Sequence, residues 1–173
     1  RASAQKLPAD MRKRYENLVG ICVAIRSNYT QLSSTSQIFA RQMEERLEGL
    51  LQGFLRLLVA AQMHRDYLNH ASPEEIQREL GSLEKAVDTD PPKVQEINRR
   101  RIEILQKRLE KFGKIQENHQ VIDAQCAAME DVLELIRDQS VTMKDPQQVS
   151  DQLGNLVRDV EQTEESIRQV EAI

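Results

Sequence analysis

The densest group of side chains that could bind a ligand is a run of cations between residues 93 and 114. This stretch holds eight basic and three acidic side chains. Its cations are Lys93, Arg99, Arg100, Arg101, Lys107, Arg108, Lys111 and Lys114. Such a cluster attracts phosphate, either in anionic lipid head groups or in nucleic acid. Nucleic acid is the less favoured ligand, because the stretch is poor in aromatic side chains that stack on bases.

A membrane surface is therefore one expected partner. The residues predicted to contact it are Arg99, Arg100, Arg101, Lys107, Arg108 and Lys111. The alternative is that these cations pair within the chain and form a solvated face. Glu96, Glu103 and Glu110 interleave with them, and residues 115–173 carry an acidic excess that could lie opposite.

The residue types that usually carry catalysis or bind metal do not have the required spacing. His64 and His70 are six residues apart rather than the four that place two side chains on one helix face, and His119 falls on an apolar seam. The sequence contains no glycine-rich phosphate loop, no paired cysteines at metal-ligand spacing and no Glu-x-x-His pair. We therefore expect no enzyme activity, metal, cofactor or small-molecule substrate.

Two cysteines, Cys22 and Cys126, are too few for a disulfide scaffold and fit a reducing compartment. Both fall on apolar seams, where burial makes a thiol inert, so we expect structural thiols. No apolar run reaches the roughly 18 residues of a membrane span. We predict a cytoplasmic protein, or the soluble part of a membrane-anchored or larger one. The sequence starts and ends in mid-pattern, as a fragment of a longer chain would.

The elements that position these residues are predicted to be helices. Among 173 residues only 3% are aromatic, with 6 Gly and 5 Pro, which disfavours sheets. Apolar residues recur at alternating steps of three and four, as in coiled coils. The pattern predicts an all-α, elongated antiparallel coiled-coil bundle forming one domain over 1–173. Its four helices span about 9–70, 73–88, 91–138 and 146–173.

Three boundaries support this division. Ser72 with Glu75 resembles a capping box, Asp90 precedes Pro91 and Pro92, and Asp145 precedes Pro146. The first helix would be about 90 Å long, with a bend at most at the Ser33 to Ser36 run.

The second and third helices together match the first in length. This predicts a long antiparallel hairpin, in which the first helix is one limb and the second and third helices form the return limb, kinked at Pro91 and Pro92. This antiparallel pairing sets residue i beside about 144 minus i. It brings Arg99, Arg100 and Arg101 near Glu44 and Glu45, and Arg12, Lys13 and Arg14 near Glu130, Asp131 and Glu134. It also puts Cys22 and Cys126 within about one turn of each other.

Residues 47–61 carry an apolar arc of roughly 200°, wider than the roughly 100° that one packed face needs. We expect a homodimer or a protein partner to cover the excess. The predicted interface residues are Leu50, Leu51, Phe54, Leu55 and Leu58. The alternative is that one copy buries the whole stripe in a monomeric bundle.

These features predict a non-catalytic protein-interaction and oligomerisation module, such as a scaffold, tether or stalk. The alternative is a peripheral membrane-binding helical module that uses the basic face of residues 93–114.

Overall fold

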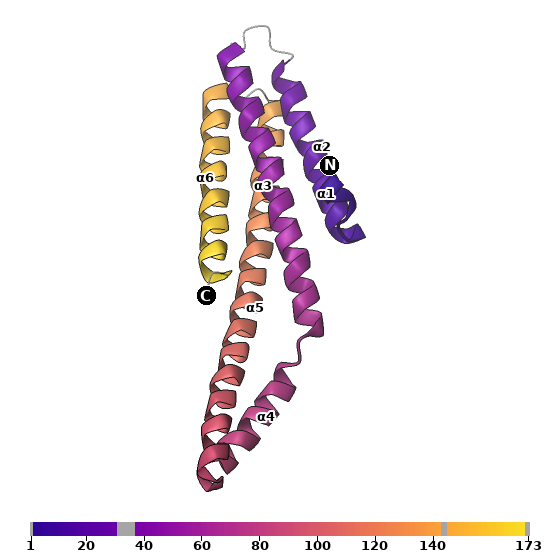
Figure 1. Cartoon of the computed structure of the whole chain (residues 1–173). Helices are drawn as coiled ribbons and strands as arrows, with labels where there is room; N and C mark the ends of the chain where they lie inside the picture. Colours follow the sequence, from indigo (N-terminus) through magenta and orange to yellow (C-terminus); the bar gives the residue numbers. More distant parts are fainter. Residues whose placement is uncertain (1, 31–36, 143–144, 172–173) are drawn as a thin grey trace. The chain divides into compact units, whose positions relative to one another are not determined.

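The computed structural model describes residues 2–30, 37–142 and 145–171, and over these residues the chain is helical, with no strand (Figure 1). The α-helices are α1 (Ala2–Gln5), α2 (Ala9–Thr30), α3 (Gln37–His70), α4 (Pro73–Ala86), α5 (Pro92–Val141) and α6 (Pro146–Glu171). A short 3₁₀ helix, η1, covers Val87–Thr89. The all-α prediction is confirmed.

The chain divides into two compact units. The first, called here the bundle unit, consists of residues 1–62 and 120–173; the second, the hairpin unit, consists of residues 63–119. The prediction of one domain over 1–173 stays a prediction.

The predicted single helix over 9–70 is wrong, because α2 and α3 are antiparallel neighbours. Arg26 of α2 forms an ion pair of 2.5 Å with Glu44 of α3, and the Tyr29 and Phe39 rings pack edge to face with centroids 6.0 Å apart. In one continuous helix, residues 26 and 44 would lie about 27 Å apart. α2 and α3 therefore run in opposite directions. The predicted bend at Ser33 to Ser36 lies outside the described residues.

The reversal changes which helices of the bundle unit run in the same direction. Arg14 contacts Glu130, and Asn28 donates a hydrogen bond of 2.8 Å to Ser140, so α2 and α5 are parallel. The predicted contact of Arg14 with Glu130 is present, but in a parallel pair rather than an antiparallel one.

Two further pairs complete the bundle unit. In α3 and α6, Arg46 contacts Ser150 and Arg56 contacts Glu164, so these helices are also parallel. The Thr163 hydroxyl donates to the Gln125 side chain across α5 and α6, which are antiparallel in Figure 1.

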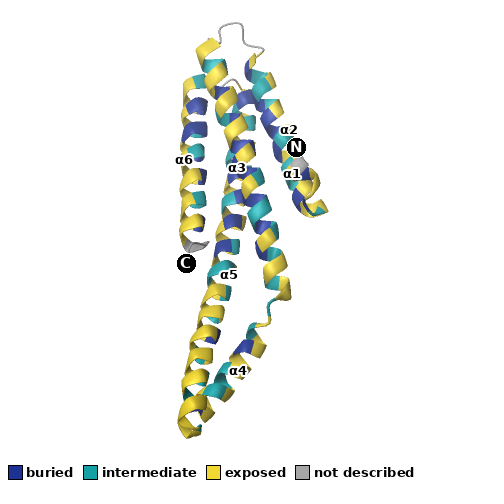
Figure 2. Cartoon of the chain, viewed as in Figure 1, coloured by how far each residue is buried: buried dark blue, intermediate teal, exposed yellow. Residues whose placement is uncertain are grey.

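One hydrophobic cluster fills the bundle unit, and four long helices contribute to it. α2 supplies Met11, Leu18, Ile21, Cys22, Ile25 and Tyr29; α5 supplies Ile122, Cys126, Met129, Leu133 and Ile136; and α6 supplies Val149, Leu153, Leu156, Val160 and Ile167. The contribution of α3 is Met43, Leu47, Leu50, Leu51, Phe54, Leu57, Leu58 and Ala61. Figure 2 shows these buried positions as stripes along each helix. Their periodic spacing is why the sequence forms helices here.

The hairpin unit reverses near residue 90 rather than between the predicted helices 9–70 and 73–88, where the predicted antiparallel pairing requires the turn. The Tyr67 and Phe112 rings pack 6.3 Å apart, and Glu79 accepts a hydrogen bond of 2.7 Å from Arg101. The end of α3 and all of α4 therefore form one limb, with α5 as the other. The predicted return limb, made of the second and third helices together, is wrong. Arg101 pairs with Glu79, whereas Glu44 pairs with Arg26.

Prolines start three of the predicted helices close to the expected residues, although the capping contacts differ. Asp145 caps α6, because its carboxylate accepts the Gln147 backbone N–H at 3.1 Å. Ser72 precedes α4 but makes no side-chain capping bond, so the predicted capping box is not formed. Asp90 instead accepts a hydrogen bond from the Asn98 side chain at 2.9 Å.

Candidate interaction surface

The apolar stripe predicted as an interface lies inside the bundle unit. Leu50 is 1% exposed, Phe54 0% and Leu58 1%, while Leu51 is also buried and Leu55 is half-buried against the same cluster. The wide apolar arc of 47–61 is thus covered by other helices of the same copy. The reason to expect a partner on this stripe is that its apolar arc is wider than one packed helix face needs. Since four of the five predicted interface residues are buried and the fifth is half-buried, little apolar surface remains exposed there.

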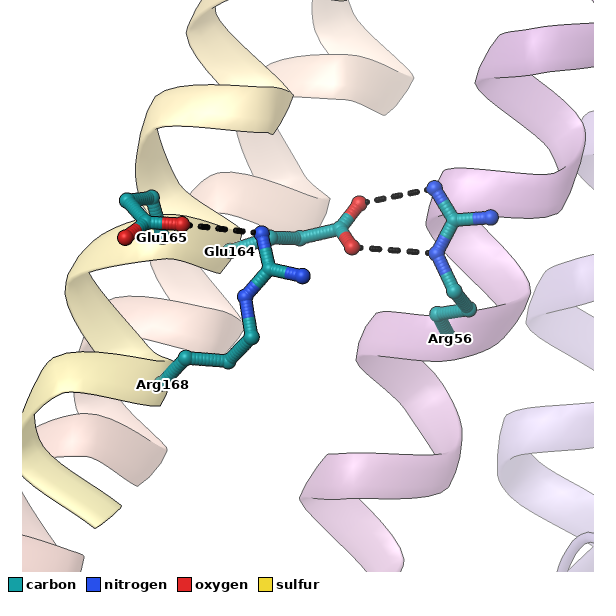
Figure 3. Close-up of polar contacts among 4 residues, drawn as sticks. All are labelled: Arg56, Glu164, Glu165 and Arg168. Carbon is teal, nitrogen blue, oxygen red and sulfur yellow. Dashed lines mark hydrogen bonds and ion pairs between the residues drawn. The ribbon is translucent and has the colours of Figure 1, made fainter. Parts of the chain in front are cut away.

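Polar side chains connect α3 to α6 along the side where the two helices face each other. Arg56 forms two hydrogen bonds with Glu164, of 3.0 Å from Nε and 2.9 Å from Nη2 (Figure 3). Arg168, one turn further along α6, donates to Glu165 at 3.1 Å. Hydrogen bonding to Glu164 raises the pKa of Arg56 above its ordinary value, despite the opposing effect of burial. The Arg56–Glu164 pair holds α6 in its register along α3, whereas the Arg168–Glu165 pair lies within α6.

A second polar contact lies further up the same two helices. Arg46 Nη1 donates hydrogen bonds of 2.5 Å to the Ser150 hydroxyl and to the Ser150 carbonyl oxygen. The Ser150 hydroxyl in turn donates to Gln42 at 3.1 Å, so the buried serine is fully paired. Gly154 leaves room for the Arg46 guanidinium, whose Cζ would lie 3.2 Å from a Cβ at that position.

The predicted basic residues occupy the hairpin unit and fall into two groups. Arg99 and Arg101 contact acids of the same unit: Arg101 pairs with Glu79 at 2.7 Å, and Arg99 lies 3.9 Å from Asp88. Arg100, Lys107, Arg108 and Lys111 are exposed and form no ion pair within the described part of the chain. The second group is available to a partner.

Exposed isoleucines share a face with these unpaired cations. Ile97 is 51% exposed and Ile104 is 52% exposed, whereas Leu105, one residue further on, is buried. At about 100° per residue, six residues in which cations alternate with these isoleucines fall within one arc of about 80° on α5. That set is Lys93, Ile97, Arg100, Ile104, Lys107 and Lys111, and it is called here the outer seam. Figure 2 shows this stretch of α5 as largely exposed.

Sequence reasoning missed the outer seam. An apolar series that starts at Val94 and Ile97 and continues through Ile102 and Leu105 would place Val94 and Ile97 on the inward face, but Val94 is 42% exposed and Ile97 51%. The later positions of that series do face inward: Leu105 is buried, and Ile102, Leu109 and Phe112 are half-buried. The missed signal is a second series of alternating steps of four and three, running from Lys93 to Lys111.

The cysteines and histidines do not form a site. Cys22 and Cys126 are free and buried, and desolvation raises the pKa of each thiol to about 12. The parallel register of α2 and α5 sets them between two and three turns apart, rather than within about one turn. His64 and His119 pack ring to ring at 6.3 Å. Among the described residues, no group of three or more His, Cys, Asp or Glu side chains could hold a metal.

Comparison with known proteins gives no relative: no family model, curated protein or solved structure matches the chain. Within residues 2–30, 37–142 and 145–171, no helix combines the length and apolar character needed to cross a membrane.

Proposed function

We propose that this chain is a non-catalytic protein-interaction module, of the kind that serves as a scaffold, tether or stalk. The observation that supports this function is the outer seam of α5. A helix that packs against neighbours on a single side needs just one apolar seam. α5 already has such a seam, which faces inward at Leu105 and its neighbours. A second seam, with Ile97 and Ile104 about half exposed, is the pattern of a helix that also packs against another protein.

The docking surface differs from the one expected from the sequence. Leu50, Phe54 and Leu58 are buried, so oligomerisation through residues 47–61 would require the bundle unit to open. The outer seam requires no such rearrangement.

Site-specific photocrosslinking in the cells that produce the protein tests this function. A photoreactive amino acid replaces Ile97, Ile104 or Gln106, where Gln106 is exposed but lies outside the outer seam. We expect protein adducts from positions 97 and 104 and none from 106. No protein adduct at 97 and 104, or equal adducts at all three positions, contradicts the proposed function.

Peripheral membrane binding by residues 93–114 is the second candidate, and the exposure of Arg100, Lys107, Arg108 and Lys111 favours it. In that case the crosslinks would reach lipid rather than protein. Binding to anionic vesicles would also fall with salt and with the substitutions Arg100→Glu and Lys107→Glu.

A further inference from the structure

The outer seam has the spacing of one strand of a coiled coil. Ile97 and Ile104 are seven residues apart, at equivalent heptad positions, and Arg100 and Lys107 alternate with them. On the two flanks of the seam, Glu96, Glu103 and Glu110 form one row, and Arg101 and Arg108 the other. Charged flanks of this kind set the partner and orientation of paired helices. The occupant that fits this geometry is therefore another helix.

A second copy of this helix is a poor occupant, because four of the six seam positions, Lys93, Arg100, Lys107 and Lys111, are cations. Pairing two outer seams would place Arg100 and Lys107 of each copy among the cations of the other. Like charges facing each other along a seam destabilise the pair and act against self-association. The occupant must therefore bring negative charge.

An anionic membrane is also a weaker fit than an acidic helix. Residues 63–119 carry eleven basic and eleven acidic side chains, and the whole chain has a net charge of -4. The excess of cations that attracts an anionic bilayer is confined to residues 93–114, with eight basic and three acidic side chains, and the acidic side chains of the rest of the unit offset it. Direct pairing between carboxylates and the unpaired cations Arg100, Lys107 and Lys111 does not need a net positive charge.

We infer that the outer seam of α5 binds an acidic amphipathic helix of another protein, packed along residues 93–111 as in a two-stranded coiled coil. In this complex, apolar side chains of the partner cover Ile97 and Ile104, and its glutamates or aspartates pair with the cations at the alternating seam positions. This inference rests on the proposed function and specifies the chemistry of the partner.

The test uses a synthetic helical probe of about four heptads. Leucine and glutamate alternate along its seam at steps of three and four, and alanine and glutamine fill the other positions. Binding to the full chain is measured by fluorescence anisotropy in about 50 mM and about 500 mM salt. We expect a dissociation constant in the micromolar range at low salt and at least about tenfold weaker binding at high salt.

Paired variants separate the outer seam from general electrostatics. Arg100→Glu with Lys107→Glu reverses two seam charges and should weaken binding at least about tenfold. The control, Lys85→Glu with Arg99→Glu, makes the same change in net charge at exposed positions outside the seam and should change binding less than about threefold. Circular dichroism establishes that both variants keep the native helix content.

Reversing the charges on both the probe and the chain should restore binding. A second probe, with lysine in place of each seam glutamate, should bind the Arg100→Glu/Lys107→Glu variant more tightly than it binds the native chain. A scrambled probe, with the composition of the first but its leucines moved off the seam, should bind at least about tenfold more weakly than the first probe, because Ile97 and Ile104 are then left uncovered.

Three results would overturn the inference. They are absence of binding of the acidic probe at about 1 mM, equal weakening by the seam variant and its control, and tight binding to vesicles with about 30% phosphatidylserine that the seam variant abolishes. Protein adducts at positions 97 and 104 without probe binding would leave the proposed function standing and reject an acidic helix as the partner.

Discussion

At the residue scale, two glycines one turn apart on α3 have different surroundings. Gly49 is exposed, and a Cβ there would meet no atom within 4 Å. Gly53 is buried against α6, and its Cβ would lie 3.0 Å from Val160 Cγ1 and 3.5 Å from Glu164 Oε1. The absence of a side chain at Gly53 is what allows α3 and α6 to approach closely at this point.

Alanine at the two positions should therefore have different effects on stability. Gly49→Ala should raise the free energy of unfolding by up to about 1 kcal/mol, since alanine is the better helix former. Gly53→Ala gains the same propensity but must displace buried Val160, so its free energy of unfolding should be about 1–2 kcal/mol below that of Gly49→Ala. Urea denaturation measures both values, and equal gains would contradict the close packing at Gly53.

The buried thiols give stability a pH dependence with a definite sign. Burial raises the pKa of Cys22 and of Cys126 to about 12, while an unfolded thiol titrates at about 8.5. Between these values the folded chain keeps protons that the unfolded chain has lost. The thiol contribution to stability is therefore present below about pH 8.5 and is lost as the pH rises toward 12.

We expect the native chain to lose more stability between pH 8 and pH 10 than a Cys22→Ala/Cys126→Ala variant, because the variant has no thiol to titrate. Urea denaturation at the two pH values measures this difference in slope, independently of the cavities that alanine creates. In the native state at pH 8, both thiols should also react slowly with a thiol-specific reagent. Identical slopes for the two proteins would contradict the buried thiols.

At the element scale, the antiparallel packing of α2 against α3 distinguishes the bundle unit from the single long helix that the sequence predicts. The ion pair between Arg26 and Glu44 sets the register of these two antiparallel helices. The sequence suggested one helix because the series of apolar positions continues, with little change of phase, from Tyr29 to Phe39 and beyond. Such a series shows which residues face a neighbour, but it is the same whether the helix continues or folds back.

Crosslinking distinguishes these two arrangements directly. In an Arg26→Cys/Glu44→Cys variant, a short bismaleimide should join the two new cysteines within one chain, which mass spectrometry of a protease digest detects. An Arg12→Cys/Glu44→Cys variant serves as the control, because residue 12 lies about four turns away from residue 26 along α2. Equal crosslinking in both variants, or none in the first, would contradict the antiparallel packing of α2 and α3.

At the scale of the whole molecule, burial of residues 47–61 within one copy changes the expected effect of charging them. Leu51 is 7% exposed in the hydrophobic cluster, so Leu51→Glu places a carboxylate among buried apolar side chains. We expect a loss of about 3 kcal/mol or more in the free energy of unfolding, with loss of helix content in circular dichroism.

Ile104→Glu is the matched surface variant, since Ile104 is 52% exposed. It should keep the native helix content and stability and affect only binding along the outer seam. Light scattering completes the test. A Leu51→Glu variant that stays fully helical while its mass falls from a dimer to 19.9 kDa would instead favour the dimer predicted from the sequence.

The sequence by itself determined the all-α class and the approximate helix ends at Pro73, Pro92 and Pro146, because apolar periodicity and proline act locally along the chain. The contact of Arg14 with Glu130 is present too, but the antiparallel register from which it was predicted is not.

Only the tertiary structure decided the antiparallel packing of α2 and α3, the reversal near Asp90, the parallel pairs of helices, and the burial of Phe54. It also separated the paired cation Arg101 from the unpaired Arg100. The physical reason is that a helix face has the same sequence whichever neighbour covers it, whereas exposure and ion pairing depend on which helices meet and in which direction they run.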